Sequence, residues 1–206
     1  MEKRNYAASY QTKQAMVAAL KTLMAQKPLE KVTIQEIADL CGMKRQNFYY
    51  HFEDIYDLLR WMFEEEAVSL LQKREGALLW QEGLLQLFQY LQDNRAVCLC
   101  ALRSPGRDSL RRFFREEIHA VIHRTIAGFE DEIGGPTEQT NNLELLSHFY
   151  VVALAGLVES WLLGEMDQTP EELVAFCDTV LTDQIRGAAL RIGKGGPGKE
   201  LSDSIV

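Results

Sequence analysis

The apolar residues of this chain recur with the period of an α-helix, and no stretch alternates between apolar and polar residues as a half-buried strand does. The prolines are few and fall between the helical stretches, at positions 28, 105, 136, 170 and 197. This placement fits helices, because proline interrupts a helix but is tolerated in the connections. The sequence therefore predicts an all-α fold of about nine helices.

The segment 33–52 has the pattern of two short helices separated by a sharp turn. Thr33 with Glu36 three positions later forms a capping box that starts the first helix, and Gly42 suits the turn. The second helix spans about residues 44–50 and opens with basic and amide side chains. This is the layout of a helix-turn-helix motif, whose second helix enters the major groove of DNA.

Helices are also expected on both sides of this motif. The first spans about residues 10–26 and turns one apolar face inward. Asp54 caps another helix that continues to about Arg74 and connects the N-terminal part to the rest of the chain. Phe48 and Phe52 are expected to face the core.

The C-terminal part is predicted to contain helices at about residues 80–91, 96–102, 108–133 and 143–163, followed by a last helix that starts at Thr169-Pro170. The helix at 143–163 is apolar on all sides and must therefore be covered on all sides. With the last helix, at about 170–187, it would form a four-helix interface with a second copy of the chain. The alternative, in which both helices are core of a monomer, stays open.

Charge is unevenly distributed along the chain, whose formal net charge is −8. Residues 1–52 contain eight Lys or Arg and four Asp or Glu, a net charge of +4, and the remaining residues contain 14 and 26, a net charge of −12. The basic part coincides with the helix-turn-helix pattern, where phosphates would have to be neutralised.

Other classes of protein are disfavoured. The longest apolar stretch, 149–163, contains Glu159 and is shorter than the roughly 20 residues that a bilayer crossing needs. The N-terminus has no secretory pattern, so we expect a cytoplasmic protein without a membrane span. The four cysteines lack the spacing of a structural zinc site, and neither a metal nor a cofactor is predicted. Nucleophile-elbow, zinc-protease and phosphate-loop motifs are absent, so the sequence does not predict an enzyme.

The order of these features resembles the TetR family of transcriptional regulators. The similarity lies in the threonine that opens the second helix, Ile37-Ala38, the glycine turn, the aromatic cluster 48–52 and a Leu-rich fourth helix. The runs 49–59 and 156–162 are similar to the subgroup that contains the dihydroxyacetone kinase activator. Two positions depart from the family: Lys44 replaces a Ser or Thr, and Ile55 replaces a frequent Lys.

The resemblance implies a homodimer that binds a palindromic operator and is switched by an effector, a small molecule or a protein. We expect a flexible basic arm at 1–9, a helix-turn-helix domain at 10–53, an effector-binding and dimerisation domain at 54–190 and, from its Gly-rich sequence, a disordered tail at 191–206. Repressor and activator both remain open. The rival hypothesis is a helical protein-interaction module without specific DNA binding.

Residues at the start of the second motif helix are expected to contact base edges. Arg45 can pair with guanine, and Gln46 or Asn47 with adenine. The resemblance implies that Tyr49 packs and also donates to a phosphate, and that Tyr50 and His51 flank the DNA backbone. The predicted DNA-contacting residues are Thr33, Lys44, Arg45, Gln46, Asn47, Tyr49, Tyr50 and His51.

Aromatic and histidine side chains of the C-terminal part are the candidates for an effector pocket. They are Trp80, Phe88, Phe114, His119, His123 and Trp161, with Tyr90 and Phe113 beside them. Core packing is the competing interpretation of each, because aromatic residues at helical spacing are more often buried in the core. Arg107, Arg111 and Arg115 recur every four residues. Such a stripe suits an anionic ligand or a partner protein, but a solvated face neutralised by Glu116 and Glu117 is favoured.

Overall fold

The computed structural model describes residues 2–72, 80–108, 110–116, 118–119, 122–123 and 140–193, and within these ranges every regular element is a helix, as predicted. In chain order the elements are α1 (Glu2–Met24), η1 (Leu29–Lys31), α2 (Ile34–Leu40), α3 (Arg45–His51), α4 (Ile55–Phe63), η2 (Glu64–Val68), α5 (Ser69–Gln72), α6 (Trp80–Asp93), α7 (Arg95–Leu102), α9 (Thr140–Leu163) and α10 (Pro170–Gly193). The described residues between 107 and 123 are helical as well. Of the two η elements, η1 is a 3₁₀ turn and η2 is a π-helical segment.

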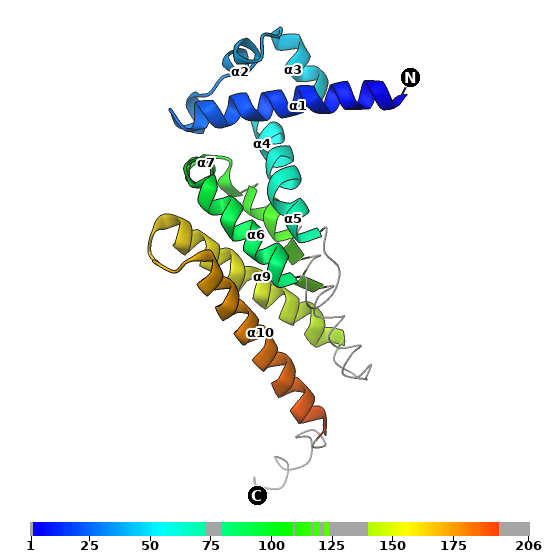
Figure 1. The fold of residues 1–206 in the computed structure, drawn as a ribbon, viewed down its shortest axis with the longest axis vertical. Helices are drawn as coiled ribbons and strands as arrows, with labels where there is room; N and C mark the ends of the chain where they lie inside the picture. Colours follow the sequence, from blue (N-terminus) through cyan, green and yellow to red (C-terminus); the bar gives the residue numbers. More distant parts are fainter. Residues whose placement is uncertain are drawn as a thin grey trace, which may run out of the picture.

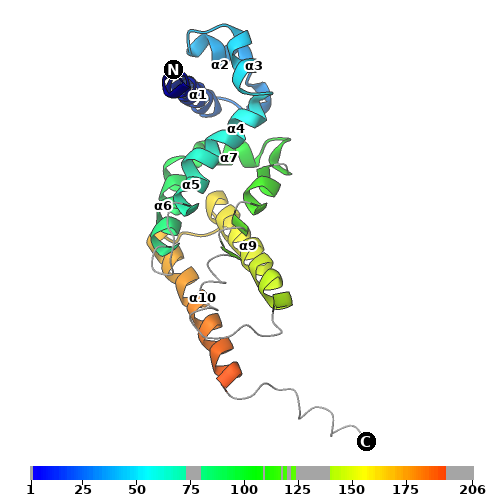
Figure 2. The same cartoon turned by 90° about the vertical axis from the view of Figure 1, so that its right-hand side faces the viewer.

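The molecule is elongated, with α1, α2 and α3 at one end and α4 leading from them into the remaining helices (Figure 1). α6 packs against α10, and α7 packs against both α1 and α9. A view at right angles shows α9 and α10 diverging away from the loop that joins them (Figure 2). None of the described helices combines the length and the apolarity needed to cross a membrane.

One continuous apolar cluster joins the two ends of the molecule. It includes Leu20 and Phe48 in the N-terminal part, Met62 on α4, and Phe88 and Leu173 in the C-terminal part. Because α4 contributes buried residues to both parts, a displacement of α4 disturbs packing at both ends.

The helix boundaries of the motif follow from the capping residues. Thr33 Oγ1 accepts a hydrogen bond from the Glu36 amide at 3.3 Å, and the Glu36 carboxylate accepts one from the Thr33 amide at 2.9 Å. Gly42 has φ +64°, a conformation that side chains rarely adopt, and this turn aims α3 away from α2. Asp54 caps α4 by accepting from the Asp57 amide at 2.8 Å. These starts and the turn agree with the sequence prediction.

A second capping box starts α10. The Thr169 amide donates to the Glu172 carboxylate at 2.8 Å, and the Glu172 amide donates to Thr169 Oγ1 at 3.3 Å. Pro170 at the first helical position needs no acceptor for its nitrogen. The predicted start of the last helix is therefore confirmed.

Three predicted boundaries differ from the structure. α1 begins at Glu2, so residues 2–9 are helical, in contrast to the predicted flexible arm. The reason is local, because Ala7 and Ala8 favour a helix and no Gly or Pro interrupts residues 2–9. The helix predicted to run unbroken to Arg74 is interrupted by η2. α10 extends to Gly193, beyond the predicted start of the tail. The rest of that tail, Arg74 itself and residues 124–133 of the predicted long helix lie outside the described residues.

Candidate nucleic-acid interface and ligand cavity

The first turn of α3 presents polar side chains to solvent. Lys44 precedes the helix in an extended conformation and makes no side-chain capping bond, as its departure from Ser or Thr implies. Arg45, Gln46 and Asn47 are exposed, whereas the next residue, Phe48, is fully buried. The burial of Phe48 fixes the rotation of α3 and so turns the preceding polar residues outward.

Arg45 is held against the next turn of its own helix. Its Nη2 donates to Tyr49 Oη at 2.8 Å, and its guanidinium carbon lies 5.5 Å from the Tyr49 ring centroid. The Tyr49 ring packs edge-on against Phe48, with 5.9 Å between centroids, while 49% of the residue stays exposed. The i, i+4 spacing thus positions the guanidinium over the surface of α3.

The two residues that end α3 differ in environment. Tyr50 is 82% exposed and contacts the ring of His51 edge-on. His51 is half-buried, with Nδ1 3.5 Å from Ser9 Oγ of α1. Partial burial lowers the pKa of His51 from its ordinary 6.5, and the positive charge of Lys13 lowers it further, so the imidazole is neutral at neutral pH. Ser9 belongs to the part of α1 that the sequence did not predict as helix.

Thr33 is engaged within its own capping box. Its hydroxyl donates to Glu36 Oε2 at 2.8 Å, and Glu36 is also bound by Lys27 Nζ. These hydrogen bonds, with Lys27 as the largest contribution and Thr33 next, lower the pKa of Glu36 to about 2. Thr33 is therefore a helix cap in this structure. To contact a phosphate as predicted, its hydroxyl would have to donate to the phosphate instead of to Glu36.

A cavity of about 360 Å³ lies between α4, α6, α7, α9 and the segment 107–118. Its walls are mainly apolar and include Phe63 at the end of α4, Leu87 on α6 and Val151 on α9. A small molecule of mostly apolar surface can be enclosed in such a space.

The structure separates the effector-pocket candidates. Phe114 lines the cavity. Phe88 and Trp161 instead form a buried edge-to-face pair with centroids 5.4 Å apart, and Trp161 Nε1 donates to the carbonyl of Gln168. These two rings pack against each other and do not line this cavity, which favours core packing, and their place in an effector pocket stays a prediction.

The remaining candidates do not line the cavity either. The rings of His119 and His123 lie beside each other in a tilted arrangement, with centroids 6.0 Å apart. The side chain of Trp80 lies outside the described residues. Within the described parts of the chain, no three His, Cys, Asp or Glu side chains gather as metal ligands, and all four cysteines are free thiols.

Arg107, Arg111 and Arg115 all line the cavity. Arg111 forms an ion pair with Glu159 of α9, which lies 48 positions away in the sequence. The prediction of a solvated stripe neutralised by Glu116 and Glu117 was therefore wrong for Arg111. The side chain of Glu117 lies outside the described residues. The four-residue spacing was the correct signal, since it places all three side chains on one face of the helix.

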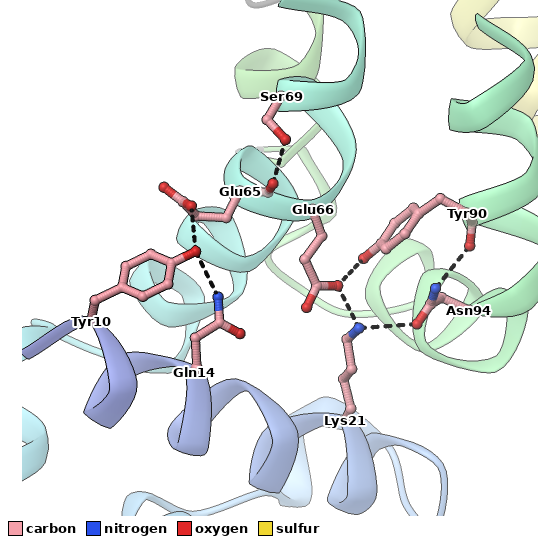
Figure 3. Close-up of polar contacts among 8 residues, drawn as sticks. All are labelled: Tyr10, Gln14, Lys21, Glu65, Glu66, Ser69, Tyr90 and Asn94. Atoms are coloured by element: carbon pink, nitrogen blue, oxygen red, sulfur yellow. Dashed lines mark hydrogen bonds and ion pairs between the residues drawn. The ribbon is translucent and has the colours of Figure 1, made fainter. Parts of the chain in front are cut away.

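A polar cluster joins α1 to the C-terminal part, and Figure 3 shows it. Glu66 of η2 accepts hydrogen bonds from Lys21 Nζ of α1 and from Tyr90 Oη of α6, the latter at 2.8 Å. Lys21 Nζ also donates to Asn94 Oδ1 at 3.1 Å. Burial raises the pKa of Tyr90, and the neighbouring Glu66 raises it further, so the hydroxyl stays a donor. We call Lys21, Glu66, Tyr90 and Asn94 the junction cluster.

Sequence analysis missed this cluster. Glu64, Glu65 and Glu66 look like an exposed charge run, yet Glu66 is about three-quarters buried and Glu65 accepts a hydrogen bond from Tyr10 Oη at 3.1 Å (Figure 3). No local pattern could have revealed it, because Lys21 is 45 residues away from Glu66.

A second contact connects α4 to the wall of the cavity. Gly106 lies directly against the ring of Tyr56, and a Cβ atom at position 106 would come within 2.2 Å of Tyr56 Cε1. Gly106 precedes Arg107, which lines the cavity. Phe63, the last residue of α4, packs against Phe114 with 5.0 Å between ring centroids. α4 therefore touches the cavity wall at two places.

Comparisons with known proteins agree with this geometry. Residues 11–62 match the family described as "Bacterial regulatory proteins, tetR family". Residues 79–183 match the description "Transcriptional regulator C-terminal region". The two matches cover both the helix-turn-helix and the cavity-bearing part.

Similar individual proteins include an activator and repressors. The HTH-type dhaKLM operon transcriptional activator DhaS of Lactococcus lactis subsp. lactis (strain IL1403) is 30% identical over 84 residues, 41% of this chain and 45% of the activator. The match thus spans about half of that relative's length. The probable acrEF/envCD operon repressor of Escherichia coli (strain K12) is 26% identical over 80% of this chain and 82% of the repressor.

Solved structures share the fold at low sequence identity. The dihydroxyacetone kinase operon activator DhaS superposes with a TM-score of 0.70 at 22% identity, over 85% of this chain and 96% of that one. NalD, the secondary repressor of the MexAB-OprM multidrug efflux pump in Pseudomonas aeruginosa, superposes with a TM-score of 0.58 at 16% identity, over 90% of this chain and 96% of that one.

Proposed function

Because this chain belongs to the TetR family of bacterial transcription regulators, we propose that it is a cytoplasmic homodimer that binds a palindromic operator and is switched by an effector in its C-terminal domain. Members of this family regulate transcription and are not enzymes. The observation that carries the proposal is the exposed first turn of α3. There the side chains of Arg45, Gln46 and Asn47 are exposed to solvent, while Phe48 is buried and packs α3 against the core. Side chains in this place on a helix-turn-helix contact base edges.

The exposed residues around α3 divide into two roles. Arg45 contacts guanine, and Gln46 or Asn47 contacts adenine. Lys44, Tyr49, Tyr50 and His51 contact phosphates, which position the helix without selecting sequence. The structure supports a smaller role for Thr33, whose hydroxyl already donates to Glu36.

Homodimerisation is supported by an apolar stripe that nothing in the described chain covers. On α9 the stripe contains Leu145, Phe149, Val152, Gly156 and Leu163, and on α10 it contains Phe176 and Val180. Leu145 is 67% exposed, Phe149 61% and Phe176 58%, which disfavours the alternative of a monomer core. Contiguous exposed apolar surface of this kind marks an interface. A second copy of the same two helices would close it as a four-helix bundle.

The switch is supported by the contacts of α4 with the cavity. Phe63 belongs both to α4 and to the cavity wall. The ring of Tyr56, also on α4, contacts Gly106, which precedes the cavity residue Arg107. A ligand that prefers one position of these residues therefore prefers one position of α4. In a dimer the two recognition helices must lie about one DNA turn apart, or a multiple of it, to enter successive major grooves. A small rotation of α4 moves each recognition helix and changes this spacing, so the dimer no longer fits the operator. The same mechanism serves a repressor or an activator, since the position of the operator decides the sign.

Selection of DNA fragments from a random pool by the purified protein tests the proposal. We expect a palindromic sequence. Arg45→Ala should lose base preference at one position per half-site, at a cost of about 1–3 kcal/mol of discrimination. Arg103→Ala is the matched control, because Arg103 is an exposed arginine in the C-terminal domain.

Two results would overturn the DNA-binding proposal. An Arg45→Ala protein that selects the same sequence as the control would refute the assignment of the base-contacting residue. Absence of any selected sequence, together with a shallow dependence of binding on salt concentration, would favour the rival protein-interaction module.

A further inference from the structure

We propose that the cavity selects amphipathic anions, that is, molecules with one acidic group such as a carboxylate at one end and an apolar body at the other. The inference rests on the proposed function only in that it takes the cavity to be the effector site. The ligand class itself follows from the cavity's size, its wall and its charges.

The size and the wall favour a small apolar body. A volume of about 360 Å³ lies at the lower end of the range for ligand pockets, roughly 300–1,000 Å³. The apolar residues of the wall come from five parts of the chain, among them Phe63, Leu91, Phe114 and Val158. Transfer of an apolar ligand from water into this space is favourable in proportion to the apolar area it buries.

The charges of the wall favour an anion. Arg107, Arg111 and Arg115 come from successive turns of one helix, and Glu159 is the single acidic residue among the described residues of the wall. Glu159 already pairs with Arg111, so the wall keeps an excess of two positive charges. Asp108 lies 3.9 Å from Arg107 and 3.8 Å from Arg111, but it does not line the cavity and is 78% exposed, so it screens them weakly.

Arg111 also has an unused hydrogen-bond donor. Its Nε is buried and finds no acceptor among the described residues, although its Nη2 is bound by Glu159. A buried donor without an acceptor is costly, and an acidic group placed beside it would supply the acceptor. Guanidinium groups bind carboxylates through paired hydrogen bonds of fixed geometry, which an ammonium group does not offer.

A cationic ligand fits this wall poorly. It would meet three guanidinium groups and would have to displace Arg111 from Glu159 to reach a carboxylate. A neutral ligand would bury the same apolar surface but would leave the arginines without a counter-charge. The cavity should therefore rank an anion first among ligands with one and the same apolar body.

Calorimetric titration of the full-length protein with three probes tests this order. Decanoate, decan-1-ol and decyltrimethylammonium share a ten-carbon chain and carry a negative, no and a positive charge. The two ions are used below their micelle concentrations and the alcohol below its solubility limit. We expect decanoate to bind about tenfold more tightly than decanol, and the cation to bind most weakly. Equal binding of decanoate and decanol, or tighter binding of the cation, would overturn the proposal.

Three variants locate the binding. Arg115→Met should weaken decanoate binding about tenfold and leave decanol binding unchanged. Arg112→Met is the matched control, since Arg112 is an exposed neighbour on the same helix that does not line the cavity. Glu159→Gln should strengthen decanoate binding, because it releases Arg111 and adds a positive charge to the wall. Loss of folding cannot imitate a gain in affinity, so weaker or unchanged decanoate binding in Glu159→Gln would count against the proposal.

These titrations contain no DNA, so their outcome is separate from that of the operator experiment. Tight decanoate binding that leaves operator affinity unchanged would uphold the ligand class and refute the effector role. Failure to prefer decanoate, in a protein that still selects a palindrome, would refute the ligand class and leave the regulator intact.

Discussion

Thr33 and Glu36 show how much of the N-terminal domain depends on single side chains. Each satisfies the backbone amide of the other, and Lys27 adds an ion pair to the same carboxylate. The start of α2 fixes the position of the turn at Gly42 and therefore the orientation of α3. Residues far from the DNA surface can thus affect DNA binding through the orientation of α3.

We predict that Thr33→Ala lowers the free energy of unfolding by about 1 kcal/mol, the usual cost of losing a helix cap. Thr33→Ser keeps the capping oxygen and should retain most of the stability. Urea unfolding followed by circular dichroism measures both. If Thr33→Ser were as unstable as Thr33→Ala, the methyl group of Thr33 and not its hydroxyl would be the stabilising part.

The lowered pKa of Glu36 gives the stability a defined pH dependence. The ordinary pKa of 4.5 falls to about 2 in the folded protein, so the ionised carboxylate stabilises the fold above about pH 4.5. This contribution is lost as the pH falls from 4.5 towards 2, because the unfolded chain takes up the proton first. The stability difference between the protein and its Glu36→Gln variant should therefore be constant at neutral pH and shrink in that acidic window. Unfolding curves at several pH values measure it, and a difference that stayed constant down to about pH 2 would refute the ion pair with Lys27.

Helix starts and turns were predictable because their signals are local. The capping boxes at Thr33 and Thr169, the cap at Asp54 and the turn at Gly42 each depend on residues no more than three positions apart. The orientation of the helices was not predictable in the same way. The spacing of Arg107, Arg111 and Arg115 revealed a stripe, but the cavity that it faces is formed by distant helices, among them α9 with Glu159.

At the scale of helices, the junction cluster is the polar connection between α1 and the C-terminal domain. Lys21 comes from α1, Glu66 from η2, Tyr90 from α6, and Asn94 from the turn before α7 (Figure 3). Two helices, α1 and α6, thus meet at the carboxylate of the π segment, and the turn before α7 joins them through Lys21. A rotation of α4 that carried η2 with it would have to stretch these bonds.

We predict that Lys21→Met destabilises the protein by about 2 kcal/mol, between the values for exposed and fully buried ion pairs, because both side chains are about three-quarters buried. The variant leaves Glu66 charged with Tyr90 as its donor. The double variant with Glu66→Gln should recover part of the loss, since it removes the unpaired charge. Lys31→Met, at an exposed position, is the control. Thermal or urea unfolding measures all of them, and equal stability of Lys21→Met and the control would show that the cluster does not stabilise the junction.

At the scale of the whole molecule, the C-terminal helices carry apolar surface that the described residues of one copy leave exposed. The sequence predicted helices at 143–163 and 170–187 that needed covering, but it could not distinguish a dimer from a monomer core. The exposure of Phe149 and Phe176 is the observation that supports the proposed interface over a monomer core. Val152 and Gly156 belong both to the stripe and to the cavity wall, so the proposed effector would bind beside the proposed interface.

We predict that Phe149→Glu converts the dimer to a monomer, because it would place two like charges in an apolar interface between identical copies. Operator affinity should fall steeply in consequence, since each monomer would hold only one half-site. Sedimentation velocity measures the mass, and a gel-shift titration measures the affinity. Ala96→Glu adds the same charge at an exposed position of α7 and should leave both unchanged. A Phe149→Glu protein that remained dimeric would place the interface elsewhere.

The π segment η2 constrains the length of the chain between the two domains. A π turn holds one residue more than the α-helical turn that it replaces. Winding the same residues Glu64–Val68 as an ordinary α-helix would therefore rotate everything that follows by about 100° relative to α4. Glu66 would then no longer point at Lys21. The π winding of these five residues thus sets the angular phase between α4 and the helices that surround the cavity.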